Sequence, residues 1–205
     1  MDAQREATHF KNRVLDLLDT LARKQPSSPL ILRLILPLVD LVTNSSADEK
    51  HLSDKAQGIL KSRIGKSKEH PSKVNLEQVT VILQELHSRA RKARSTSALP
   101  VLTSCSLYVS RVIQAANAEV LVGVYSDSLR DFITRKNSSL NTAFFKELIH
   151  RYPGCGWLLR NQLVELSGQA VNHYRQTQVY QLLYDVVNQL SAVVCAPPLS
   201  EGSFV

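Results

Sequence analysis

The chain has 205 residues, of which 43% are hydrophobic and 21% are charged, and its formal net charge is +7. This composition excludes an intrinsically disordered chain, because there is enough apolar surface to build a core. We also expect no membrane span and no signal peptide, since no run reaches the ~18 consecutive apolar residues that a span needs and the first ten residues are polar.

Leucine-rich stretches, with apolar residues three, four and seven positions apart, predict helices throughout and no strands. Pro26 and Pro71 should end the first and third helices, because the residue before a proline avoids the α region. Asn75 followed by Gln78 is typical of a helix N-terminus, and residues 152–154 read as a turn. The expected helices cover residues 2–24, 29–43, 48–69, 76–94, 99–117, 118–135, 141–151, 156–170 and 174–195.

Short connections between these helices favour antiparallel pairs that repeat every 40–47 residues or so, the size of a HEAT or armadillo unit. We therefore expect an all-α, HEAT/armadillo-like solenoid of about nine helices. Residues 1–195 should form one domain, a fragment of a longer protein, and residues 196–205 a flexible tail. No self-similar motif repeats along the chain, so an irregular helical bundle stays open as an alternative.

The positive charge is concentrated between residues 50 and 94. This stretch holds eleven Lys or Arg against four acids, so its net charge of +7 equals that of the whole chain. A face of this kind suits nucleic acid or an acidic partner, although solvated helix faces would read the same way. The candidate contacts are Lys50, Lys55, Lys61, Arg63, Lys66, Lys68, Lys73, Arg89, Arg91, Lys92 and Arg94.

Two details sharpen this hypothesis. Lys50, Lys61 and Lys68 fall within about 20° of each other if residues 48–69 form one helix, so they predict a lysine stripe. The cations of residues 89–94 have a local explanation instead, because positive charge stabilises a helix C-terminus. The stretch contains no Phe, Tyr or Trp, so we expect contact with phosphates rather than stacking on bases.

We find no sequence support for catalysis, a metal site or a cofactor. Gly65-Lys66-Ser67 lacks the first glycine of a phosphate-binding loop and lies in a helical context. The six histidines show no metal-binding spacing, and no serine lies in a nucleophile motif. The three cysteines are widely separated, which predicts reduced, buried thiols. We therefore expect a protein that is not an enzyme and has no small-molecule substrate.

Five segments resemble the C-terminal region of the DNA polymerase phi / Myb-binding protein 1a family. They are HFKNRVLDLLDTLARKQPSSPL (9–30), LPLVDLV (36–42), DEKHLSDKAQGILKSRIGKSKE (48–69), EQVTVILQELHSRARKA (77–93) and CSLYVSRVI (105–113). The resemblance covers residues 10–135. The segments contain no metal-binding carboxylate motif, so the polymerase name implies no catalytic residue here.

Members of that family are much longer α-solenoid proteins of the nucleus and nucleolus, linked to ribosomal RNA gene transcription and large-subunit assembly. The resemblance thus implies a non-enzymatic scaffold in ribosome biogenesis, whose partners are preribosomal RNA and assembly factors. Ribosomal DNA and transcription factors are further possible partners. The alternative is a protein–protein interaction module, a transcription co-regulator or a dock for assembly factors, without direct nucleic-acid contact.

Overall fold

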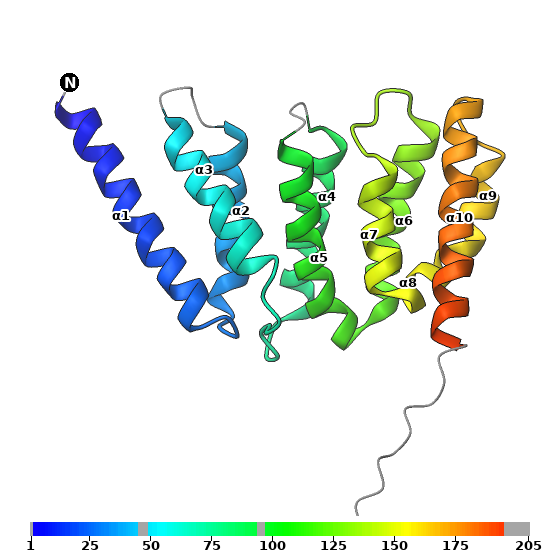
Figure 1. The fold of residues 1–205 in the computed structure, drawn as a ribbon, viewed down its shortest axis with the longest axis horizontal. Coiled ribbons are helices and arrows are strands. Elements are labelled where there is room, and N and C mark those ends of the chain that lie inside the picture. Colours follow the sequence, from blue (N-terminus) through cyan, green and yellow to red (C-terminus); the bar gives the residue numbers. More distant parts are fainter. Residues whose placement is uncertain (1, 45–48, 94–96, 195–205) are drawn as a thin grey trace, which may run out of the picture.

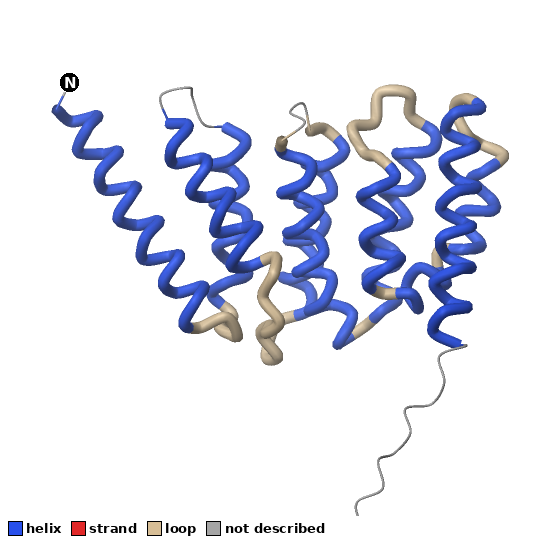
Figure 2. Tube along the Cα trace, viewed as in Figure 1, coloured by secondary structure: helices blue, strands red, loops and turns tan. Residues whose placement is uncertain are grey.

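The structure, a computed structural model, describes residues 2–44, 49–93 and 97–194. These residues form α-helices and one π-helical segment, with no strand among them (Figure 2). The elements are α1 (Asp2–Lys24), α2 (Leu30–Asn44), α3 (Lys50–Gly58), the π-helical η2 (Ile59–Ile64), α4 (Leu76–Arg91), α5 (Ala98–Ala116), α6 (Ala118–Thr134), α7 (Thr142–Arg151), α8 (Pro153–Leu158), α9 (Arg160–Ser167) and α10 (His173–Val194).

The helices stand side by side in two layers (Figure 1). One layer, here the front layer, contains α1, α3 with η2, α5, α7 and α10, each in contact with the next. The other, the back layer, contains α2, α4, α6 and α9, again in sequence. Successive helices alternate between the layers, so each front helix from α3 onward follows its back-layer partner along the chain.

The repeat length fits the predicted solenoid. The back-layer helices begin at Leu30, Leu76, Ala118 and Arg160, so that successive units are offset by 46, 42 and 42 residues. This spacing lies within the range of about 40–47 residues for HEAT and armadillo units. The prediction of an all-α solenoid is confirmed, and the irregular bundle is excluded by the regular alternation of the layers.

The core runs along the interface between the two layers. Helix α5 contributes twelve buried residues because it contacts α2, η2, α4, α6 and α7. The five largest fully buried side chains are aromatic and come from α5, α6 and α7, at the middle of the row: Tyr108, Tyr125, Phe132, Phe144 and Phe145.

Three asparagines set where helices begin. Asn75, Asn117 and Asn141 each accept hydrogen bonds from backbone amides in the first turn of α4, α6 and α7. Those amides have no partner within the helix, so the side-chain oxygen stabilises each start. The predicted cap at Asn75 is confirmed, with 3.2 Å between its Oδ1 and the amide nitrogen of Gln78.

The predicted single helix over 48–69 is wrong. α3 ends at Gly58, η2 continues to Ile64, and residues 65–75 form a loop. The backbone N–H of Gly65 bonds to the carbonyl of Leu60, five residues earlier, which is the π-helical pattern. The wider turn changes the angle between successive residues, so a spacing of 100° per residue does not hold through this element.

The prediction over residues 152–170 also needs correction. Pro153 starts α8 instead of forming a turn, because its fixed φ suits the first position of a helix. The expected helix over 156–170 is divided between α8 and α9, which meet at the buried Leu159. Two glycines in α8 weaken its helix propensity, and Gly156 lies close against Ile149 of α7.

Candidate nucleic-acid interface

Two of the candidate cations hold α1 against its front-layer neighbours. Lys55 Nζ lies 2.7 Å from the carboxylate of Asp16 and also donates to the carbonyl of Asn12. Arg63 Nε lies 2.7 Å from Asp19. Both carboxylates belong to α1, so these two ion pairs hold α1 against α3 and η2. Because each cation is already paired with a carboxylate, its positive charge is largely neutralised for a ligand.

Arg89 makes a similar link between helices in the back layer. Its guanidinium lies 2.7 Å from Asp40 of α2 and 2.7 Å from Glu85 of its own helix. The side chain is half-buried between two carboxylates, so it joins α2 to α4. It also lines a cavity of about 790 Å³ between α2, α4 and α5.

The remaining cations of α4 divide into three cases. The half-buried Arg91 donates to Ser128 Oγ of α6 over 3.3 Å. Lys92 is exposed at the end of the helix. Arg94 lies outside the described residues.

The predicted lysine stripe is wrong. Lys50 is exposed at the first residue of α3, Lys61 is half-buried within η2, and Lys68 lies in the following loop. α3 and η2 run from one edge of the row to the other (Figure 1). At 1.5 Å per residue, Lys50 and Lys68 are therefore separated by roughly 20 Å along the axis.

The loop over residues 65–75 carries three exposed lysines, Lys66, Lys68 and Lys73. Its backbone is anchored at Ser67, whose carbonyl accepts a hydrogen bond from Arg111 of α5 and whose hydroxyl donates to the carbonyl of Glu69. The three lysines thus project from a loop that is fixed to the body of the solenoid.

Two further cations lie beside this loop. Ser27, in the turn between α1 and α2, donates to Glu69 Oε2 over 2.7 Å, which places the two loops side by side. Arg23 and Lys24 end α1 directly before this turn, and both are exposed. Sequence analysis missed them because they lie outside residues 50–94. Cations in the last turn of a helix also have a local explanation, so the sequence alone carried no signal that these two side chains contact a ligand.

We call these five side chains the basic edge: Arg23, Lys24, Lys66, Lys68 and Lys73. Among the described residues, none of them forms an ion pair within 4.0 Å. Two exposed acids lie near these cations, Glu69 in the same loop and Glu77 in the first turn of α4. Five cations against these two acids leave the edge with an excess of positive charge. Flexible ammonium groups without a carboxylate partner are suited to phosphate oxygens.

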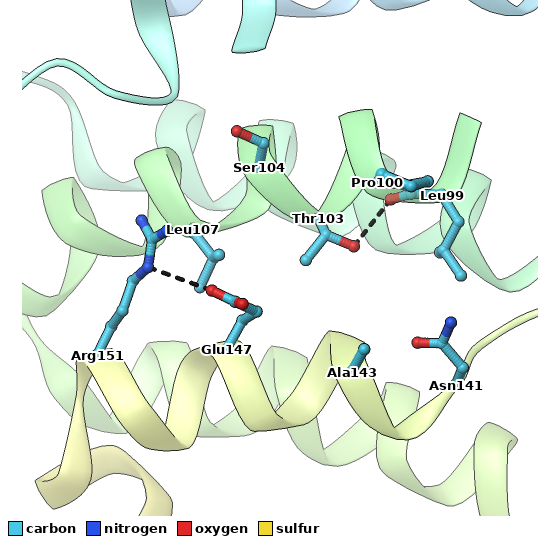
Figure 3. A pocket seen from close by; sticks show the side chains of 9 residues that line it. All are labelled: Leu99, Pro100, Thr103, Ser104, Leu107, Asn141, Ala143, Glu147 and Arg151. Carbon is cyan, nitrogen blue, oxygen red and sulfur yellow. Dashed lines mark hydrogen bonds and ion pairs between the residues drawn. The ribbon is translucent and has the colours of Figure 1, made fainter. Parts of the chain in front are cut away.

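A second cavity, of about 310 Å³, lies in the front layer between α5 and α7 (Figure 3). Its charged groups, Glu147 and Arg151, pair with each other over 3.5 Å. Thr103 donates its hydroxyl proton to the backbone of its own helix at Leu99. Asn141 accepts a hydrogen bond from the backbone N–H of Phe144. Two charged side chains of this cavity thus pair with each other, and Thr103 and Asn141 bond to the backbone.

The described cysteines are inert thiols. Burial raises the pKa of Cys105 to about 12 and also raises the pKa of Cys155, so both stay protonated at neutral pH. Cys195 lies outside the described residues. In the part of the chain that the structure describes, no three His, Cys, Asp or Glu side chains gather as a metal site would require. None of the described helices is both long and apolar enough to cross a membrane.

Two layers of alternating antiparallel helices define this chain as an α-solenoid, a class of helical-repeat proteins that bind partners along extended surfaces. The chain belongs to the family described as Myb-binding protein 1A-like, TPR repeats, whose model matches residues 25–196. The units of 42 and 46 residues are longer than the usual tetratricopeptide unit of about 34 residues.

Similar proteins carry the same name. The chain is 26% identical over 163 residues to Myb-binding protein 1A-like protein of Danio rerio and 28% identical over 179 residues to Myb-binding protein 1A of Mus musculus. Each match covers 70% of this chain but 13% of the relative. Myb-binding protein 1A of Homo sapiens is 24% identical over 184 residues, with 14% of its length covered. No solved structure matches significantly.

Proposed function

We propose that this chain is a non-enzymatic scaffold segment of a nuclear and nucleolar protein in ribosome biogenesis, and that its basic edge contacts preribosomal RNA. Membership of the family supports the scaffold role, because α-solenoids present extended surfaces to their partners. The observation that supports the RNA contact is a set of five cations on one edge that have no carboxylate partner within the described residues.

The expected mode of contact is electrostatic. Residues 50–94 contain no aromatic side chain, so the loop of the basic edge offers no platform on which a base could stack. Lys66, Lys68 and Lys73 would neutralise phosphates and release the counterions bound to them. Recognition would then follow the shape of folded RNA rather than its sequence, and affinity would fall steeply as salt is raised.

The test reverses the three loop lysines together, as Lys66→Glu, Lys68→Glu and Lys73→Glu. The probe is a fluorescein-labelled RNA hairpin, and its Kd is measured by anisotropy over a series of salt concentrations. We expect affinity to fall at least about tenfold at low salt, and the slope of log K against log salt to decrease by about 2 as phosphate contacts are lost.

A matched control reverses three exposed lysines on the opposite edge, as Lys50→Glu, Lys92→Glu and Lys136→Glu. Both variants change the net charge by the same amount, so a general loss of attraction to RNA affects them equally. Only a site at the basic edge makes the first variant bind more weakly than the control. Equal losses, or a greater loss in the control, contradict the proposal.

A protein partner is the second candidate for the same edge. The names of the relatives say that they bind Myb, and an acidic segment of a transcription factor or an assembly factor could meet these lysines. If reversal of the loop lysines leaves the RNA affinity unchanged, the RNA contact is contradicted and a protein partner becomes the favoured candidate. Crosslinking in a purified preribosome, followed by identification of the attached RNA or peptide, then separates the two.

A further inference from the structure

The turn between α1 and α2 carries the sequence pattern of a phosphorylation site. Residues 26–29 read Pro-Ser-Ser-Pro, so Ser28 has one proline directly after it and another two positions before it. Of the eight prolines in the chain, Pro29 is the one that follows a serine or a threonine. A proline at this position has no N–H to donate and keeps the residue before it extended. Proline-directed kinases select this feature, and those of the mitogen-activated class also favour the earlier proline.

The turn is accessible to an enzyme. Residues 25–29 lie outside both helices, and Ser27 and Pro29 are exposed while Ser28 is half-buried. In Figure 1 this turn and the loop over residues 65–75 lie on the same, lower edge of the row. Further helical units would extend a solenoid at its ends and would leave its loop edges uncovered.

The end of α1 can unwind to fit the cleft of a kinase, which holds its substrate as an extended segment. Ala22 is the buried side chain of the last turn, and Arg23 and Lys24 are exposed. Opening this turn therefore exposes little apolar surface, so its free-energy cost is small.

The contacts of the neighbouring serines make Ser28 the favoured acceptor. Ser27 Oγ donates to Glu69 Oε2 over 2.7 Å, so a phosphate on Ser27 would face a carboxylate. Ser67, which lies among the loop lysines, donates to the backbone of Glu69 and has no proline after it. Ser28 Oγ instead accepts from the backbone N–H of Leu30 over 3.4 Å, and a phosphate oxygen could accept that bond in its place.

The cations of the basic edge lie close to this turn. Arg23 and Lys24 precede Ser28 by five and four residues, in the exposed last turn of α1. The hydrogen bond from Ser27 to Glu69 holds the turn beside the loop that carries the three lysines. A phosphate on Ser28 is therefore introduced among side chains that have no carboxylate partner within the described residues.

We propose that Ser28 is a phosphorylation site for a proline-directed kinase, and that its phosphate weakens the contact of the basic edge with RNA. Ser28 Oγ attacks the γ-phosphorus of ATP and forms the new O–P bond. The bond from this phosphorus to the bridging oxygen breaks, ADP leaves, and the hydroxyl proton passes to a carboxylate of the kinase. The effect on RNA rests on the function proposed above, whereas the modification itself does not.

The phosphate acts through its charge. It adds about −1.5 to −2 at neutral pH, which offsets most of the excess left by the five cations and two acids of the edge. Its oxygens also accept hydrogen bonds from Arg23 and Lys24, so these side chains are no longer available to RNA. The group lies beside the first turn of α2, where negative charge is favourable, so the fold should tolerate it.

The first measurement maps the modification without RNA. The purified chain is incubated with ATP and an active mitogen-activated protein kinase, and mass spectrometry locates the phosphate. We expect close to one phosphate per chain, on Ser28. Pro29→Ala should lower the rate at least about tenfold, whereas Ser27→Ala should leave it unchanged. A chain that takes up no phosphate at Ser28 would overturn the site.

The second measurement compares the RNA affinity of the two forms, with the fluorescein-labelled hairpin as the probe. At about 100 mM salt the phosphorylated chain should bind at least about tenfold more weakly, because about two phosphate contacts are lost. The slope of log K against log salt should decrease by about 1–2. Phosphatase treatment should restore both values, and Ser28→Ala treated with the kinase should bind as the untreated chain does.

A matched pair of variants separates the place of the charge from its amount. Ser28→Asp carries part of the charge of a phosphate and should weaken RNA binding about threefold. Asn137→Asp adds the same charge to an exposed residue between α6 and α7, at the opposite edge of the row, and should weaken binding less. Equal losses in the two variants would overturn the role of the basic edge in this regulation.

The outcomes distinguish this inference from the proposed function. If the unmodified chain does not bind the hairpin, the RNA contact and its regulation both fail, and mass spectrometry alone decides whether Ser28 is a modification site. If the unmodified and phosphorylated chains bind equally well, the RNA contact stands and its regulation by Ser28 is overturned. A loss of helical circular dichroism on phosphorylation would also overturn it, since unfolding would then explain the weaker binding.

Discussion

His87 lies in α4 and is fully buried, with its ring edge-on to Tyr125 at a centroid distance of 4.4 Å. Arg91 donates to Ser128 Oγ, so we assign the hydroxyl proton of Ser128 to His87 Nδ1, 2.8 Å away. The other ring nitrogen then carries a proton and faces aromatic rings rather than an acceptor. The neutral imidazole is thus the form that this site accommodates.

Burial, and secondarily the charge of Arg91, lower the pKa of His87 from 6.5 to about 3. The unfolded chain takes up this proton below pH 6.5, whereas the folded chain does so only near pH 3. The contribution to stability is therefore complete above pH 6.5 and decreases as the pH falls toward 3, by up to about 1.4 kcal/mol per pH unit.

We predict that His87→Gln flattens the acid side of the stability profile. Between pH 6.5 and 5 the wild type should lose about 2 kcal/mol more of its unfolding free energy than the variant, whatever the variant's stability at pH 7. Urea unfolding over a pH series measures this difference, and the other titrating groups cancel because both proteins contain them. Parallel profiles would show that His87 does not couple folding to protons.

At the scale of elements, Gly65 controls how η2 packs on α5. A Cβ at this position would lie 2.1 Å from Ser104 Oγ and 3.1 Å from the carbonyl oxygen of Leu60. A side chain here would have to displace Ser104 Oγ and would also crowd the carbonyl oxygen of Leu60. The same junction begins the loop that carries Lys66 and Lys68, so the packing of the helices also determines where the lysines lie.

We predict that Gly65→Ala lowers the unfolding free energy by about 1–3 kcal/mol, the usual cost of overpacking. Gly58→Ala is the matched control, since a Cβ there meets nothing within 4 Å. In a helix it should stabilise by about 0.5–1 kcal/mol. Adding Ser104→Ala should recover part of the loss at Gly65. Equal stability of the two alanine variants in urea would contradict this account of the junction.

At the scale of the whole molecule, the solenoid is held unevenly along its length. α5 has twelve buried residues, whereas Leu15 and Ala22 are the buried side chains within residues 6–24 of α1. α1 is joined to the next unit by three ion pairs near the surface, at Lys11, Lys55 and Arg63. Each such pair is worth at most about 1 kcal/mol. The first helix should therefore open without the rest of the row.

Native-state hydrogen exchange tests this expectation. Amides of α1 should exchange on the order of 100-fold faster than those of α5, because local opening of α1 exposes little apolar surface. About 1 M NaCl should widen the difference, since salt screens the ion pairs but not the core. Equal protection of the two helices would show that the solenoid opens as one unit.

The sequence predicted the solenoid architecture and most of the helices, but not the end of α3 at Gly58 or the division between α8 and α9. Apolar spacing, prolines and the Asn75 cap are local signals, and helix formation depends on residues a few positions apart. It also located the exposed lysines of the 65–75 loop, because charge concentration is visible without a fold. It did not reveal the π-turn at Gly65, nor the close approach of Ser104 from α5, a helix that is distant in the chain.

Which cations are available to a ligand depends on how distant helices pack together. Lys55, Arg63 and Arg89 resemble the loop lysines in sequence, yet their charges are met by Asp16, Asp19 and Asp40. Arg63 and Arg89 lie 44 and 49 residues from these carboxylates. Pairing over such distances is fixed by how whole helices pack.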